Sequence, residues 1–168
     1  MKTSIISQQD QEVHITKAAA GHISSADFKD TFSTTNHEDS LELIVRNILT
    51  TQQRWIIYLF QLRNWLAKFF GLQTVLPDDH NERFAPGGYV GFFRIYELLP
   101  NEIILGADDS HLNFRLSVHK TEAIENNVKV TTLVHFNNRL GRIYMAIVAP
   151  FHRLIVKRMV AQAYQPNK

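Results

Sequence analysis

Residues 139–164 read RLGRIYMAIVAPFHRLIVKRMVAQAY, and this long apolar stretch decides the fold that we predict for the chain. Apolar residues recur in it at four-residue intervals, which is the spacing of one face of an α-helix. That face comprises Ile143, Ile147, Phe151, Ile155 and Met159, with Leu140 and Leu154 beside it. We therefore expect a long helix that buries this stripe against a core and points Arg153, Lys157 and Arg158 toward solvent.

Pro150 lies in the middle of this predicted helix. A proline inside a helix removes one backbone hydrogen bond and clashes with the preceding turn, at a cost of roughly 3 kcal/mol. The sequence therefore predicts either a kinked helix or two helical pieces, the second of which begins at Pro150.

The region before this helix has the alternating pattern of β-strands. The predicted strands are residues 89–97, 102–107, 111–119 and 128–136. Short turn-like links join them, so we expect an antiparallel meander.

The alternation of residues in the third and fourth predicted strands, 111–119 and 128–136, predicts a sheet with one apolar and one polar face. On one face lie Leu112, Phe114, Leu116 and Val118 of the third strand with Val128, Val130, Thr132, Val134 and Phe136 of the fourth. On the other lie His111, Asn113, Arg115, Ser117 and His119 with Lys129, Thr131, Leu133 and His135. The apolar face needs cover, and the C-terminal helix is the expected partner.

The first half of the chain predicts one strand, two helices and a long loop. The strand is residues 27–33, the helices are 40–50 and 53–70, and the loop is 73–88. Residues 53–70 are the most hydrophobic part of the chain, but charged and amide side chains interrupt them, so we expect a buried helix and no membrane span. An interfacial membrane helix is the alternative, because Trp55, Tyr58 and Trp65 suit that position.

Length and composition indicate an ordinary globular protein. The chain has 168 residues, 45% hydrophobic and 20% charged, with a net charge of +2 and no cysteine. We expect one domain over residues 14–168, preceded by a disordered tail at 1–13. The first residues contain no apolar run typical of a signal peptide, so a cytoplasmic location is expected. The weak net charge argues against nucleic acid as a partner.

The predicted order of elements resembles the helix-grip fold of the START and birch-pollen-allergen superfamily. This resemblance implies an α+β fold in which a curved antiparallel sheet grips a long C-terminal helix, with two helices inserted after the first strand. Residues 105–115 (LGADDSHLNFR), 140–144 (LGRIY) and 150–153 (PFHR) also resemble the signature of an uncharacterised bacterial domain-of-unknown-function family. That resemblance covers about residues 26–162. The resemblance to this family implies a fusion to a nucleotide-binding reductase domain in some members, but the chain has no GxGxxG motif, so no dinucleotide site is expected.

Asp109, His111 and Arg115 form the first candidate site. Their even spacing places them on one face if the third strand begins by Asp109. On the functional interpretation, Asp109 positions His111 as a proton shuttle and Arg115 binds an anion. On the structural interpretation, Asp109 caps a turn and Arg115 pairs with a carboxylate such as Glu97 or Asp109.

The C-terminal helix contributes Arg142, Tyr144 and His152 as further candidates. Arg142 falls in the first helical turn, where a cation opposes the helix dipole, so a specific anionic partner is expected for it. His152 can point into a cavity between sheet and helix, or it can be a hydrogen-bonded structural residue.

No metal or cofactor site is expected. His111 and His119 lie about 26 Å apart along an extended strand at ~3.3 Å per residue, so one zinc ion cannot bind both. The loop cluster of Asp78, Asp79, His80 and Glu82 lacks the spacing of a known metal motif.

The leading hypothesis is a non-catalytic module that binds a small apolar or amphipathic molecule in a cavity under the C-terminal helix. The expected lining includes Phe93, Phe114, Val130, Val134, Ile147 and Phe151. One alternative is a cyclase- or hydrolase-like enzyme that uses His111 or His152 with Arg115 or Arg142. Another is an interaction protein that docks through the helix at 53–70.

Overall fold

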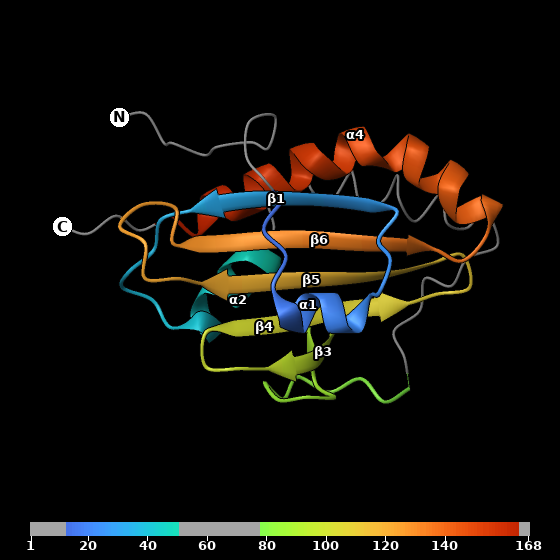
Figure 1. Ribbon diagram of the computed structural model, residues 1–168. Helices are drawn as coiled ribbons and strands as arrows, with labels where there is room; N and C mark the ends of the chain where they lie inside the picture. The colour runs from blue at the N-terminus through green and yellow to red at the C-terminus, as the bar shows by residue number, and fades with distance from the viewer. Residues whose placement is uncertain (1–12, 51–77, 165–168) are drawn as a thin grey trace.

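An antiparallel six-stranded sheet is the centre of the computed structural model, which describes residues 13–50 and 78–164. The strands are β1 (Phe28–Thr34), β2 (Tyr89–Val90), β3 (Phe93–Leu98), β4 (Glu102–Asp108), β5 (Leu112–Lys120) and β6 (Val128–Phe136). The helices are α1 (Lys17–His22), α2 (Leu41–Thr50) and α4 (Arg139–Gln162). The order in the sheet is β1-β6-β5-β4-β3-β2 (Figure 1).

The predicted fold class is confirmed. β3 to β6 form the expected meander, and the sheet curves beneath one long C-terminal helix. The strand predicted at 27–33 is β1, and the helix predicted at 40–50 is α2. The second helix predicted after β1, residues 53–70, lies outside the described residues, as does nearly all of the predicted tail. Within the described parts of the chain, no helix is both long and apolar enough to cross a membrane.

β1 forms one edge of the sheet and pairs with β6, the last strand in the chain. The register places Phe28 opposite Val134 and Asp30 opposite Thr132. This long-range pairing sets residues from the two ends of the chain side by side, beneath α4 (Figure 1).

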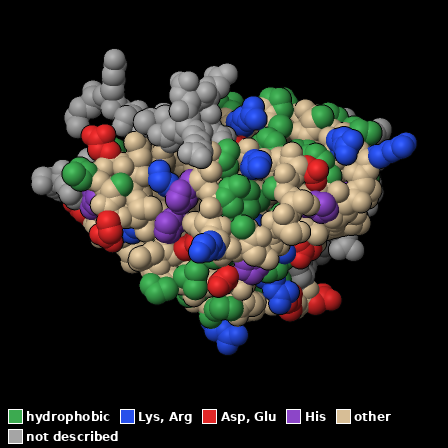
Figure 2. All heavy atoms as spheres, in the orientation of Figure 1, with side chains coloured by type: hydrophobic (Ala, Val, Ile, Leu, Met, Phe, Trp, Pro, Cys, Tyr) green, Lys and Arg blue, Asp and Glu red, His purple; other side chains and the backbone are tan. Residues whose placement is uncertain are grey.

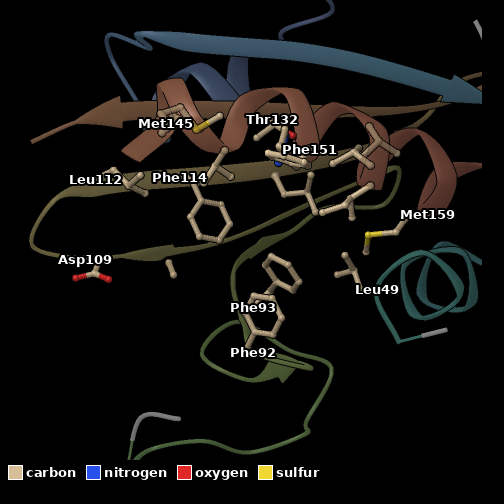
Figure 3. A pocket seen from close by; sticks show the side chains of 18 of the residues that line it. Leu49, Phe92, Phe93, Asp109, Leu112, Phe114, Thr132, Met145, Phe151 and Met159 are labelled. Atoms are coloured by element: carbon tan, nitrogen blue, oxygen red, sulfur yellow. The ribbon is translucent and has the colours of Figure 1, made fainter. Parts of the chain in front are cut away.

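The prediction of one continuous strand over residues 89–97 is wrong, because the chain reverses direction within this range. Tyr89 pairs with Arg94 and Val90 pairs with Phe93, so Gly91 and Phe92 form a two-residue hairpin turn. Gly91 has a φ of +61°, a left-handed conformation that glycine adopts at little steric cost. The turn directs Phe92 and Phe93 toward the space beneath α4 (Figure 3).

α4 is one helix of 24 residues, so the alternative of two separate pieces is wrong. It begins after Asn138, whose side chain accepts a hydrogen bond from the backbone N–H of Gly141. The carbonyl that loses its helical donor at Pro150 is that of Ala146, and both residues are exposed, so water can reach it.

The stripe predicted as the buried face of α4 is mostly wrong. Its exposed members are Ile143, Ile147, Phe151 and Leu154, which keep 43–53% of their accessible surface. The buried positions are instead Gly141, Tyr144, Met145, Val156, Met159 and Val160. Both series have helical spacing, and the docking of α4 on the sheet and α2 selects between them. Only Met159 belongs to both.

The two faces of the sheet are covered by different elements. α4 and α2 pack on the apolar face, where Ile44 and Val156 join Leu116 and Val130 in the main core. The predicted polar face is not fully solvated, because α1 packs across it and buries Ala19 against the sheet (Figure 1). Beneath this cover the buried Ser117 hydroxyl donates a hydrogen bond to Glu102.

His14 is part of this cover. Its ring stacks on His119 with centroids 5.2 Å apart, and the His14 Nε2 lies 3.0 Å from the His119 Nδ1. Burial, and then the nearby positive charges of His119 and Lys129, lower the pKa of His14 below its ordinary value of 6.5. The neutral imidazole is therefore the form that the fold accommodates.

Acidification is expected to weaken the fold through His14. Below its ordinary pKa of 6.5 the unfolded chain takes up a proton that folded His14 resists, so stability is full above that pH and falls as the pH drops. Urea midpoints at about pH 7.5 and about pH 5.5 measure this fall, and His14→Gln should make it smaller. His37→Gln removes a histidine elsewhere and is the control. An unchanged pH dependence in His14→Gln would contradict this assignment.

Candidate functional site

A pocket of about 230 Å³ lies between the apolar face of the sheet and α4. Its walls come from α2, the β2–β3 turn, β4, β5, β6 and α4, and most lining residues are apolar (Figure 3). Five of the six lining residues predicted from the sequence are present, namely Phe93, Phe114, Val130, Val134 and Phe151. Ile147 does not line the pocket and is exposed on α4.

Aromatic rings form one side of the pocket. Phe92 and Phe93 lie with ring centroids 4.1 Å apart, and Phe93 meets Phe114 edge to face at 5.8 Å. In Figure 3, Phe92 and Phe93 lie on the opposite side of the pocket from Thr132 and Phe151. These rings present both apolar area and the negative faces that attract cations.

Asp109, His111 and Tyr144 form one end of the pocket. The His111 Nδ1 lies 3.5 Å from the Asp109 Oδ2, and the His111 ring meets Tyr144 edge to face at 5.1 Å. β5 begins at Leu112, so His111 belongs to the turn before the strand and not to the strand itself. This turn lets His111 line the same pocket as Leu112 and Phe114.

A second carboxylate–imidazole pair lies beside the pocket, where α4 crosses β1 and β6. The His152 Nε2 is 3.6 Å from the Asp30 Oδ2, and His152 lines the pocket together with Thr132. Asp30 is fully buried, and Thr132 is 3% exposed. Two buried polar side chains and a partly buried imidazole thus meet beside a mostly apolar pocket.

Asp30 and Thr132 were missed as candidates by the sequence analysis. A signal was present, because Asp30 alternates with Phe28 and Phe32 and therefore occupies an apolar-face position of β1. A carboxylate at such a position is rarely buried without a partner. Its neighbours were not readable, because they depend on the β1–β6 register and on the docking of α4.

Arg115 does not join Asp109 and His111, so the predicted grouping on one face is wrong. Its guanidinium donates hydrogen bonds to Asp108 at 2.7 and 3.2 Å and lies 3.8 Å above the Tyr96 ring, on the face opposite the pocket. Arg115 pairs with a carboxylate, as the structural interpretation predicted, but the partner is Asp108 and not Glu97 or Asp109. The alternation of β5 explains this, because Phe114 faces the pocket and Arg115 faces away.

The electrostatics of Asp108 follow from this pair. Burial raises the pKa of the Asp108 carboxyl, but hydrogen bonds from Arg115 and Tyr96 and the charge of Arg115 outweigh burial, so the pKa lies below its ordinary value. Burial likewise raises the pKa of the Tyr96 hydroxyl. Arg115, Asp108 and Tyr96 thus form a charged structural cluster, separate from the pocket.

Arg142 is exposed, does not line the pocket and makes no ion pair with the described residues, so the anionic partner expected for it is not found there. Across residues 13–50 and 78–164, no group of three or more His, Asp or Glu side chains has the arrangement of a metal site. On the face that Figure 2 shows, basic and acidic side chains are interspersed and form no continuous basic patch.

Fold and pocket together define an α+β protein in which an antiparallel sheet and a long C-terminal helix surround an apolar pocket. The chain belongs to the family described as "Protein of unknown function (DUF2867)", whose model matches residues 22–159. The prediction of a domain-of-unknown-function family is therefore confirmed. No curated protein and no solved structure matches the chain. The resemblance to helix-grip proteins stays a prediction.

Proposed function

We propose that this protein is a binding module for a small amphipathic molecule, which it holds between the sheet and α4. The observation that carries the proposal is the pocket of about 230 Å³, apolar over most of its lining. A cavity of about 150 Å³ with apolar walls is enough to bind benzene. The apolar part of a ligand, with one aromatic ring, therefore fits between Phe93, Phe114 and Phe151.

The arrangement favours binding over the catalytic alternative. That alternative needs His111 or His152 beside Arg115 or Arg142, and neither arginine lines the pocket. The other alternative, docking through residues 53–70, falls outside the described residues. Apolar walls with a few polar groups match the composition of small-molecule sites in general.

Titration with 2-phenylethanol tests the proposal. We expect saturable shifts of the methyl NMR signals that line the pocket, such as those of Leu116, Val130 and Val134. The methyl groups of Val118 and Ile103, which are buried outside the pocket lining, are the internal control and should shift far less. Absence of saturable shifts, or equal shifts at both sets of methyl groups, would contradict the proposal.

A further inference from the structure

Four buried polar atoms beside the pocket have no hydrogen-bond partner among the described residues. They are both carboxylate oxygens of Asp30, the Oγ1 of Thr132 and the Nε2 of His152. Buried polar groups in folded proteins are almost always satisfied, and an unsatisfied cluster calls for a missing partner. The separation of 3.6 Å between the Asp30 Oδ2 and the His152 Nε2 is too long for a hydrogen bond between them.

The cluster is held in place by rigid elements. Asp30 and Thr132 are directly opposite each other in the β1–β6 ladder, on the face that α4 covers. His152 reaches them from α4, and its ring also meets Phe28 edge to face at 5.7 Å. Thr132 and His152 line the pocket and Asp30 does not, so a ligand head group approaches Asp30 past these two side chains.

The acceptor atoms of the cluster favour a ligand that donates hydrogen bonds. A carboxylate only accepts hydrogen bonds, and no described residue donates one to Asp30, since the His152 Nε2 lies within ion-pair distance but beyond hydrogen-bond distance. No lysine or arginine is among the described residues that line the pocket, whereas Asp109 adds a second carboxylate at the other end. An anionic ligand would therefore meet like charge, and the aromatic walls suit a cation.

We infer that the pocket takes a small molecule with an apolar body and an amine head, and that Asp30, Thr132 and His152 receive this head. The inference rests on the proposed function and adds the class of ligand. An ammonium group supplies up to three donors and compensates the buried carboxylate, which an alcohol does only in part. The aromatic body remains between the phenylalanine rings.

Three probes with the same aromatic body test the inference on the full chain: 2-phenylethylamine, 2-phenylethanol and 3-phenylpropanoate. We expect the amine to bind about tenfold more tightly than the alcohol, as a charge-assisted hydrogen bond allows, and the acid to bind most weakly. Calorimetric or NMR titration gives the three dissociation constants. Binding of the alcohol without a preference for the amine would overturn the ligand class alone, whereas failure of every probe would overturn the proposed function.

Substitutions locate the amine head. Asp30→Asn keeps the shape of the side chain and should weaken amine binding about tenfold while changing alcohol binding less than about threefold. Thr132→Val should weaken amine binding about fivefold and serves as the second variant if Asp30→Asn does not fold. Glu125→Gln removes a negative charge at an exposed position that does not line the pocket, so it is the matched control and should leave amine binding nearly unchanged. A larger loss of amine binding in Asp109→Asn, at the other end of the pocket, than in Asp30→Asn and Thr132→Val would overturn the assignment.

Discussion

Gly141→Ala is expected to lower the free energy of unfolding by about 3 kcal/mol, because a methyl group at this position has no space. A Cβ built on Gly141 would lie 2.0 Å from the carbonyl oxygen of His111. That oxygen belongs to the backbone and accepts a hydrogen bond from the N–H of Asn137, so it is not free to move away. The first turn of α4 must therefore shift off the sheet.

The shift would also disturb the pocket. Gly141 lies between Asn138, which caps α4, and Tyr144, which meets His111 at one end of the pocket. We expect Gly141→Ala to weaken binding of 2-phenylethanol as well as stability, because both depend on the position of the first turn.

Gly21→Ala is the matched control for this prediction. Gly21 is also helical, but a Cβ there would have no atom within 4 Å. Alanine favours a helix over glycine by up to about 1 kcal/mol, so this variant should be neutral or slightly more stable. Urea unfolding of the two variants gives the comparison. Equal stability of Gly141→Ala and the unsubstituted chain would show that the first turn of α4 is not packed closely against the His111 carbonyl.

Val130→Phe is expected to abolish most ligand binding with little loss of stability, whereas Val118→Phe should destabilise the fold. The two valines are directly opposite each other in the β5–β6 ladder, and both are fully buried. Only Val130 lines the pocket. The added ring of Val130→Phe can enter the pocket, whereas that of Val118→Phe meets a filled core and should cost about 1–3 kcal/mol.

Binding of 2-phenylethanol is the second measurement that distinguishes Val130→Phe from Val118→Phe. A ring that occupies the pocket should weaken 2-phenylethanol binding by about 30-fold or more, equivalent to about 2 kcal/mol. Urea unfolding and NMR titration of both variants measure the two effects. Equal destabilisation by the two substitutions would argue that the interior beneath α4 is as densely packed as the rest of the core.

The fold was largely readable from the sequence because its signals are local. The alternation in residues 111–119 and 128–136 predicted β5 and β6 with the correct faces, and the spacing in 139–164 predicted α4. The hairpin at Gly91 was not recognised, because the residues on both sides of it continue the apolar pattern of a single strand. α1 was also not predicted, since its six residues carry too short a pattern.

The candidate site was readable only in part. Phe93, Phe114, Val130, Val134 and Phe151 were predicted as lining residues and do line the pocket, and His152 lines it as well, which was one of its two predicted positions. Asp109 and His111 were assigned to the polar face together with Arg115, because the sequence did not show that the strand begins at Leu112 and leaves His111 in a turn that lines the pocket. Strand alternation applies only inside a strand, so an error of a few residues at its start reverses the face of a side chain.

Local sequence patterns were sufficient for most strands, the apolar face of the sheet and the long C-terminal helix, since periodicity depends only on neighbours in the chain. Tertiary structure decided which side of α4 is buried, because two faces of that helix are apolar and only docking chooses between them. It also decided that Asp30 meets Thr132 and His152. Their contact requires the β1–β6 register and the crossing of α4, which join residues more than a hundred positions apart and which no local pattern encodes.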